Sequence, residues 1–184
     1  MDDRGLFPVE PDFAPIYRDF LMHLNAYAKD WRSLGMDEDD VLLQVREDCL
    51  VVAIDVVDRQ EQSVLSVPRA DFCQQGVMYG FDESRQLVGH MNPDPKKNNI
   101  SPFNVPEATP KQCAYAIAHF FASTLCRPVE RREWRRRDFV HKEWFFSDTE
   151  TRLQNRSVVC FENLTIGAPD QVVVVRSFGP LKKA

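Results

Sequence analysis

The sequence predicts an α+β fold in which a mainly antiparallel sheet of six to eight strands is packed by two principal helices. Apolar residues recur at helical spacing in two segments, at about 12–33 and 110–125. Short runs rich in β-branched and aromatic residues occupy much of the remaining chain, and turn residues separate them. The links between neighbouring runs are short, which favours hairpins and therefore antiparallel pairing beside the helices.

The first helix is predicted over about 12–33. Asp12 can cap it, Pro15 fits its first turn, and Gly35 lies just past its end. Its apolar residues lie three and four positions apart on one continuous face, which we expect to be core with Leu24 buried. They are Phe13, Ile16, Tyr17, Phe20, Leu21, Leu24, Tyr27, Ala28 and Trp31.

The second helix is predicted over 110–125. Thr109 is a good N-cap, and Pro110 fits the first helical position, where its missing N–H is not needed. Because its side chains are mostly small and apolar, we expect the helix to be deeply buried. Its apolar face contains Cys113, Ala116, Ile117, Phe120, Phe121 and Thr124.

Strands are expected where short β-branched or aromatic runs are bounded by turn signals. These runs cover 41–46, 49–57, 62–67, 76–82, 86–90, 157–162 and 171–178. Residues 68–75 are expected to form a loop or a helical turn, and 91–109 a long proline-rich loop. After Pro128 the pattern fits either one long strand, with Trp134 and Trp144 on one side, or a strand that follows a short helix.

The length of 184 residues and the hydrophobic fraction of 43% fit a single domain over 1–184. No apolar run approaches the ~20 residues that cross a bilayer, and the acidic N-terminus does not resemble a signal peptide. We therefore expect a cytoplasmic protein without membrane contact. The cysteines are odd in number and lack a CxxC spacing, so we expect five free thiols. They are Cys49, Cys73, Cys113, Cys126 and Cys160.

Charge is unevenly distributed along the chain. The net charge is −5, and residues 1–62 hold 15 acidic side chains against 6 basic ones. Two acidic runs flank the strand predicted at 41–46, and both lack the glycine turn and alternating oxygen ligands of a calcium loop. We expect either a solvated loop or a surface that binds a basic protein partner. This surface consists of Asp37, Glu38, Asp39, Asp40, Glu47 and Asp48.

A cluster of arginines interleaved with Trp134 follows the second helix. Guanidinium groups bind phosphates and carboxylates through paired hydrogen bonds and stack on aromatic rings. Three interpretations stay open: a solvated face paired with acidic residues of the chain, a site for an acidic protein, or a phosphate site. The acidic total charge argues against a nucleic-acid partner. The cluster consists of Arg131, Arg132, Arg135, Arg136 and Arg137.

His141 and Glu143 lie two positions apart, so on a strand they would point to the same side. Such a pair can perform general acid–base catalysis, but it also arises by chance in a chain that is 28% charged. No GxSxG, P-loop or GxGxxG motif is present in the sequence. The histidines lack metal-ligand spacing, so we expect no metal and no cofactor.

These features predict a non-catalytic cytosolic binding protein whose partner is another protein. Its composition has the general character of toxin-neutralising immunity proteins and of secretion chaperones, which would make the partner a toxin or a secreted effector; the chain carries no family signature. One alternative is an enzyme that uses the arginine cluster and His141 on a phosphorylated small molecule or nucleotide, in one deep pocket where these residues converge. The other alternative is a structural subunit of a larger assembly.

Overall fold

The structure is a computed structural model that describes residues 5–73, 78–82, 108–136, 139–157 and 167–176. Three predicted segments lie outside these residues. They are the strand at 86–90, the loop at 91–109 up to residue 107, and the strand at 157–162 beyond its first residue.

The helices of the described residues are α1 (Pro15–Ala28) and α2 (Pro110–Leu125), with short 3-10 helices at Trp31–Leu34 and Glu38–Asp40. The strands are β1 (Val41–Arg46), β2 (Cys49–Ile54), β3 (Val56–Asp58), β4 (Ser63–Ser66), β5 (Pro68–Cys73), β6 (Met78–Asp82), β7 (Val129–Arg136), β8 (Phe139–Phe146), β9 (Thr151–Ser157) and β10 (Gln171–Arg176). Every paired strand in the described part is antiparallel, which confirms the predicted α+β class. The strands are shorter and more numerous than expected, and they form three sheets.

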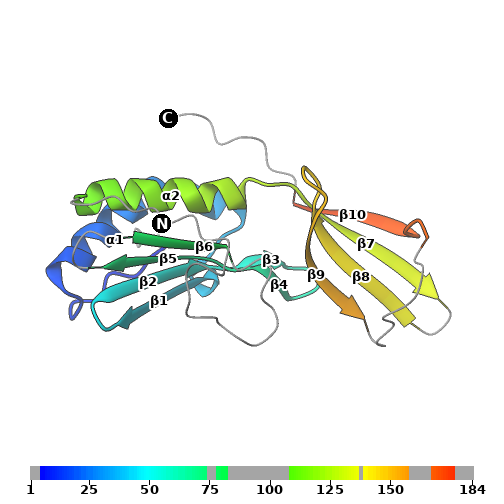
Figure 1. The fold of residues 1–184 in the computed structure, drawn as a ribbon, viewed down its shortest axis with the longest axis horizontal. Coiled ribbons are helices and arrows are strands. Elements are labelled where there is room, and N and C mark those ends of the chain that lie inside the picture. The colour runs from blue at the N-terminus through cyan, green and yellow to red at the C-terminus, as the bar shows by residue number, and fades with distance from the viewer. Residues whose placement is uncertain (1–4, 74–77, 83–107, 137–138, 158–166, 177–184) are drawn as a thin grey trace.

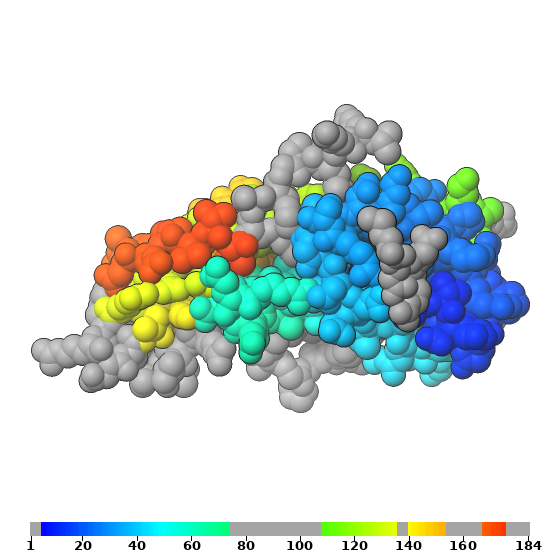
Figure 2. Space-filling model, turned by 180° about the vertical axis from the view of Figure 1, so that it is seen from behind, coloured from blue at the N-terminus to red at the C-terminus, as the bar shows by residue number. Residues whose placement is uncertain are grey.

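The three sheets lie along an elongated molecule (Figure 1). The first sheet has the strand order β1-β2-β5-β6 and the second has the order β10-β7-β8-β9, while β3 and β4 form a separate hairpin. The hairpin lies between the two larger sheets in Figure 1, and Figure 2 shows the same arrangement from behind. Each larger sheet contributes to its own hydrophobic core, so the hairpin connects two packed regions.

Helices α1 and α2 pack against each other on one face of the first sheet. The predicted core face of α1 is confirmed at Phe20 and Leu24, which are fully buried, and the Phe20 ring stacks on Phe72 of β5 with ring centroids 4.4 Å apart. Tyr27, predicted on the same face, is exposed. The helix covers only the middle of the predicted segment 12–33. Asp12 does not cap it, since the N-cap position is an alanine without a side-chain acceptor.

Helix α2 has the predicted bounds, and its predicted N-cap is confirmed. The Thr109 side chain accepts a hydrogen bond from the Gln112 amide, and the Gln112 side chain accepts one from the Thr109 amide at 2.9 Å. This reciprocal pair forms a capping box, which satisfies two backbone donors that the helix leaves open. Burial raises the pKa of the Cys113 thiol on its core face. None of the described helices is long and apolar enough to span a membrane.

The run predicted as one strand at 49–57 divides at Asp55 into β2 and β3. The Asp55 amide still donates to the Asp40 carbonyl at 2.8 Å, beside the start of β1. The chain then leaves the first sheet, and β3 pairs with β4 instead. Burial and the nearby Asp40 carboxylate raise the pKa of Asp55, so this junction holds an unfavourable pair of acidic groups.

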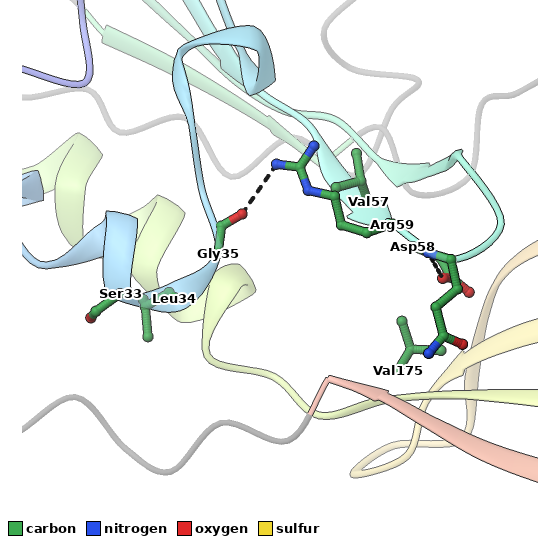
Figure 3. Close-up of a pocket in the computed structure, with 8 residues that line it drawn as sticks. Ser33, Leu34, Gly35, Val57, Asp58, Arg59 and Val175 are labelled. Carbon is green, nitrogen blue, oxygen red and sulfur yellow. Dashed lines mark hydrogen bonds between the residues drawn. The ribbon is translucent and has the colours of Figure 1, made fainter.

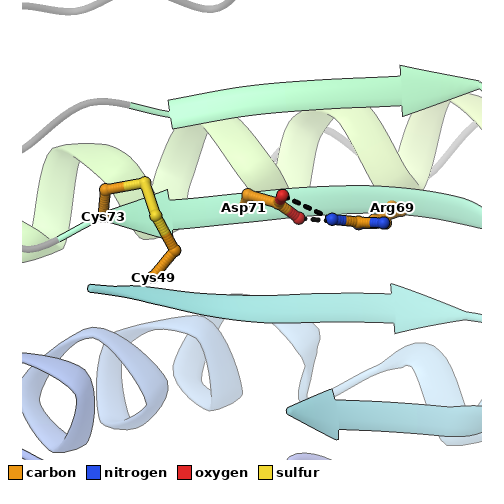
Figure 4. Close-up of a disulfide and its surroundings, with 4 residues drawn as sticks. All are labelled: Cys49, Arg69, Asp71 and Cys73. Carbon is orange, nitrogen blue, oxygen red and sulfur yellow. Dashed lines mark hydrogen bonds and ion pairs between the residues drawn. A yellow bond between two sulfur atoms is a disulfide. The ribbon is translucent and has the colours of Figure 1, made fainter. Parts of the chain in front are cut away.

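The prediction of a loop or helical turn at 68–75 is wrong, because most of this segment forms β5, an inner strand of the first sheet. Its alternate residues Ala70 and Phe72 are buried in the helix-side core. On the opposite face, the Arg69 guanidinium donates to the Asp71 carboxylate through Nε at 2.7 Å (Figure 4). These two charges obscured the apolar alternation of the strand, and the ion pair compensates for their partial burial.

The expectation of five free thiols is also wrong. Cys49 of β2 and Cys73 of β5 form a disulfide (Figure 4). The two residues are directly opposite in the antiparallel register, a pairing that their separation of 24 residues does not reveal. Cys113 and Cys126 are free thiols, and Cys160 lies outside the described residues. Because disulfides are rare in reducing compartments, the cysteines no longer support a cytoplasmic location.

After Pro128 the chain forms a hairpin of β7 and β8, without the single long strand or the short helix that the pattern allowed. In the register Trp134 is opposite His141, whereas Trp144 is opposite Arg131. Because side chains alternate along a strand, the two tryptophans lie on opposite faces of the sheet. Strand β9, which follows in the same sheet, was not predicted; its sequence is mostly polar.

Candidate functional site

The acidic segment before β1 is partly neutralised by the chain itself. Asp37 and Asp40 form a capping box around the short helix between them. The Arg59 guanidinium pairs with both carboxylates, at 3.0 Å from Asp37, and the Asp40 side chain is buried. Glu38 accepts a hydrogen bond from Arg32 at 2.8 Å. Three of the six predicted acidic binding residues therefore have partners within the protein.

The other three predicted residues keep their negative charge exposed. Asp39 lies before β1, and Glu47 and Asp48 form the turn after it. Among the described residues these three carboxylates have no ion-pair partner. Since a strand rises ~3.3 Å per residue, the two acidic ends of β1 are about 20 Å apart. The structure thus divides the predicted acidic surface into two parts, with β1 between them.

Strand β1 is an edge of the first sheet in the described part of the chain. The Asp55 amide donates a hydrogen bond to the Asp40 carbonyl, so the backbone carbonyl of Asp40 points toward β2. Because this role alternates in an antiparallel ladder, the backbone groups of Leu43 and Val45 point to the open side, whereas the Val41 amide donates to the Glu38 carbonyl of the preceding short helix.

Two apolar side chains of β1 are exposed beside this open edge. Leu42 is 54% exposed and Val45 is 46% exposed, although both lie in a strand with six well-formed pairs to β2. They lie on alternate faces of the strand, and each is accessible next to the unpaired backbone. We call Asp39, β1, Glu47 and Asp48 together the acidic edge.

The arginine cluster, in contrast, is used largely inside the protein. Arg131 is buried, and its guanidinium donates to Asp58 at 2.6 Å and to Glu133 at 2.8 Å. Asp58 also accepts from the Trp144 indole N–H at 2.8 Å. Lys142 extends this network through Glu61. The network fastens the β3–β4 hairpin to one face of the second sheet.

Two carboxylates of this network, Asp58 and Glu133, are held ionised. Burial by itself raises the pKa of Asp58, but the hydrogen bonds from Trp144 and Arg131 outweigh it, and the pKa of Asp58 lies below its ordinary value. For Glu133, burial is likewise outweighed by hydrogen bonds from Arg131 and Arg135, and its pKa is lowered. These shifts are those of a structural ion cluster, since each charge has a partner of opposite sign.

The remaining arginines are engaged nearer the surface. Arg132 bonds Glu130 at 2.6 Å and Glu150 at 2.6 Å, and its guanidinium lies 4.3 Å from the centre of the Phe145 ring. Arg135 is exposed and contacts Glu133 and Gln171. The side chain of Arg136 and the whole of Arg137 lie outside the described part of the structure. The described arginines of the cluster are therefore paired with acidic groups of the same chain, but Arg131 is buried and does not belong to a solvated face.

His141 and Glu143 point to the same side of β8, as predicted. Their Nε2 and Oε1 atoms are 3.1 Å apart. The His141 ring also lies 5.4 Å from the Trp134 ring, on the face of the sheet opposite to Arg131. The structure therefore separates His141 from the buried arginine of the cluster.

A cavity of about 440 Å³ lies between the short helix after α1, the β3–β4 turn and β10 (Figure 3). Its walls include Leu34, Val57, Arg59 and Val175. Arg59 is turned toward the Gly35 carbonyl, to which it donates at 3.1 Å. Neither His141 nor the arginine cluster lines this cavity, so it does not unite the residues of the alternative enzymatic site.

No protein-family model, curated protein or solved structure matches the chain. Within the described residues, no group of three or more His, Cys, Asp and Glu side chains is arranged to hold a metal ion. The geometry of this chain is therefore the basis for a functional proposal.

Sequence reasoning found the acidic residues but missed the exposed edge between them. The six letters VLLQVR predicted a strand, yet they contain no information about how many neighbours that strand has. The available signal was the pair Leu42 and Val45, which lie on alternate faces and cannot both pack in one core.

Proposed function

We propose that the protein binds a partner protein and that the acidic edge receives an extended basic segment of that partner. The observation that supports this is the coincidence, on one strand, of an open backbone edge, exposed Leu42 and Val45, and unpaired acidic side chains at both ends. Such an edge can accept an additional strand, whose main chain supplies hydrogen bonds and whose alternate side chains supply specificity.

Charge complementarity selects the chemistry of the partner. Asp39 lies at one end of β1, and Glu47 and Asp48 lie at the other, so lysine or arginine near both ends of the added strand would be favoured. Such charges mainly accelerate association and reject acidic competitors, whereas apolar contacts with Leu42 and Val45 slow dissociation. A toxin or a secreted effector with a basic extended segment is the kind of partner that this proposal describes.

The internal pairing of the arginine cluster supports the same proposal. Arg131 and Arg132 would have to release Asp58, Glu130 or Glu150 before they could hold a phosphate. Breaking a buried pair leaves an uncompensated charge, which costs several kcal/mol. The acidic edge needs no such rearrangement.

The first experiment reverses the exposed charges of the edge. A short peptide of alternating lysine and valine serves as the probe, and fluorescence anisotropy measures its affinity for the full chain. The triple variant Asp39→Lys, Glu47→Lys, Asp48→Lys should weaken binding about tenfold or more, a change of ~1.4 kcal/mol. Asp40 is left unchanged, because its buried carboxylate is part of the fold.

The matched control carries the same charge change elsewhere. Glu10→Lys, Asp12→Lys and Asp30→Lys alter exposed acids outside β1 and give the same net charge. We expect the control to bind the probe almost as the wild type does. Equal weakening in both triple variants, or no binding of the probe to the wild type, would refute the proposal.

The second experiment tests the backbone directly. Val45→Pro removes an amide that points to the open side, so the hairpin with β2 is preserved while an added strand is blocked. Circular dichroism should show an intact fold, and the probe should no longer bind. Binding at the wild-type affinity would show that main-chain pairing plays no part.

A further inference from the structure

In the part of the chain that the structure describes, strand β10 is an edge of the second sheet. Its sequence QVVVVR contains four consecutive valines, and among the described strands it pairs with β7 alone. Val172 is 52% exposed and Val174 is 67% exposed, which makes Val174 the most exposed large apolar residue of the described part. Figure 2 shows β10, coloured orange to red, uncovered at the surface next to β7.

On this edge the usual protection is confined to the C-terminal end of the strand, where the ladder with β7 has a bulge between Val174 and Arg176. Charged side chains, prolines, bulges or short length normally prevent the pairing of exposed edges. On β1 the acidic ends and Arg46 provide charge, and on β9, the opposite edge of the second sheet, the exposed Arg152 does so. The segment 171–175 carries no charge at all. The stretch before the bulge, Gln171–Val174, is a regular, uncharged β-branched edge that a further strand can cover.

We infer that β10 pairs antiparallel with β10 of a second copy of this chain, which makes the protein a two-fold symmetric dimer. If the register is centred on Val173, then Val172 of one copy lies opposite Val174 of the other, on the same face of the joined sheet. Both exposed valines then contact an identical apolar surface. Residues 171–175 carry no charge, so pairing with an identical segment buries no unpaired charged group.

The arrangement closes at two copies. The joined sheet has eight strands, and β9 forms both of its outer edges. The exposed, positively charged Arg152 on each β9 repels a further copy of the same edge, which disfavours growth into a fibre. The inference is independent of the proposed function, since β1 and β10 belong to different sheets.

The test is the molar mass of the full chain in solution, by sedimentation equilibrium over a concentration series. The wild type should approach twice its chain mass of 21.3 kDa as concentration rises. Val172→Lys with Val174→Lys should remain at the monomer mass, because lysines of both copies would be opposed across the two-fold axis. Leu42→Lys, an equivalent change on the β1 edge, is the control and should dimerise normally.

Three results would overturn the inference. They are a monomeric wild type at every concentration, a dimer that survives both lysines, and a dimer that Leu42→Lys disrupts. If circular dichroism shows that the double variant is unfolded, Val174→Lys alone is measured, since this side chain is the more exposed of the two.

A cross-linking experiment tests the register. Val173→Cys places identical thiols opposite each other at the two-fold axis and should form a disulfide-linked dimer on a non-reducing gel. Val172→Cys lies opposite residue 174 instead and should link much less. Two results would exclude the centred antiparallel register. They are equal amounts of disulfide-linked dimer from both variants, and no disulfide-linked dimer from Val173→Cys.

Discussion

Replacing Arg131 with methionine should be among the most damaging single substitutions in this protein. The Arg131 side chain is 6% exposed, and it holds Asp58, which is 1% exposed, and Glu133, which is 6% exposed. Methionine fills much of the same volume with apolar atoms but supplies neither hydrogen bond. The variant therefore leaves two buried carboxylates short of their main cationic partner.

Removing one partner from a buried ion pair typically costs about 3–5 kcal/mol. Whole proteins are usually stable by only ~5–15 kcal/mol, so this loss is a large share of the total. For a chain of this length each kcal/mol lowers the melting temperature by about 2–4 °C, which gives a decrease of roughly 6–20 °C. Asp58 keeps its bond from Trp144, and Glu133 keeps its contact with Arg135, so the lower half of these ranges is expected.

The assay is urea denaturation of Arg131→Met and of the wild type from neutral to acid pH. The pKa values of Asp58 and Glu133 are lowered by folding, so their stabilisation is present above the ordinary carboxyl range of ~3.9–4.3 and is lost as pH falls through the lowered values. The two proteins should therefore differ most near neutral pH and converge in acid. Arg152→Met, on the exposed edge of the same sheet, is the control and should change stability by less than ~0.5 kcal/mol. A similarly small effect of Arg131→Met at neutral pH would refute this reasoning.

Three further outcomes are expected. Leu24→Ala should lower the free energy of unfolding by about 2–5 kcal/mol, and a loss below ~0.5 kcal/mol in chemical denaturation would contradict the burial of this face. Thiol titration in denaturant should give two more thiols per chain with reductant than without it, and Cys49→Ser with Cys73→Ser should cost about 3 kcal/mol; equal thiol counts would contradict the disulfide. Folding raises the pKa of Asp55 through burial and the charge of Asp40. The protein therefore loses stability as pH rises from the ordinary aspartate pKa through the raised pKa of Asp55. Asp55→Asn should therefore raise the denaturation midpoint at neutral pH but not in acid, and a lower midpoint at neutral pH would show that the carboxylate is stabilising.

Local signals in the sequence were sufficient for several elements. The 3 and 4 spacing around Leu24 predicted the buried face of α1, and the Thr109–Pro110 pair predicted where α2 begins. The turn at 47–48 predicted the β1–β2 hairpin. These features depend on residues within one or two turns of each other, so a linear pattern contains the information that is needed.

The features that carry the proposals depended on the tertiary structure. Whether β1 and β10 are edges is decided by which strands pair beside them, and no property of either strand alone determines that. Arg131 and Asp58 are 73 residues apart in sequence, and only folding makes them a buried pair instead of a solvated cluster. The Cys49–Cys73 bond likewise follows from the β2–β5 register. In each case the stabilising contact joins segments that are distant in sequence. The residue type determines which interactions a side chain can make, and the fold determines which residue it contacts.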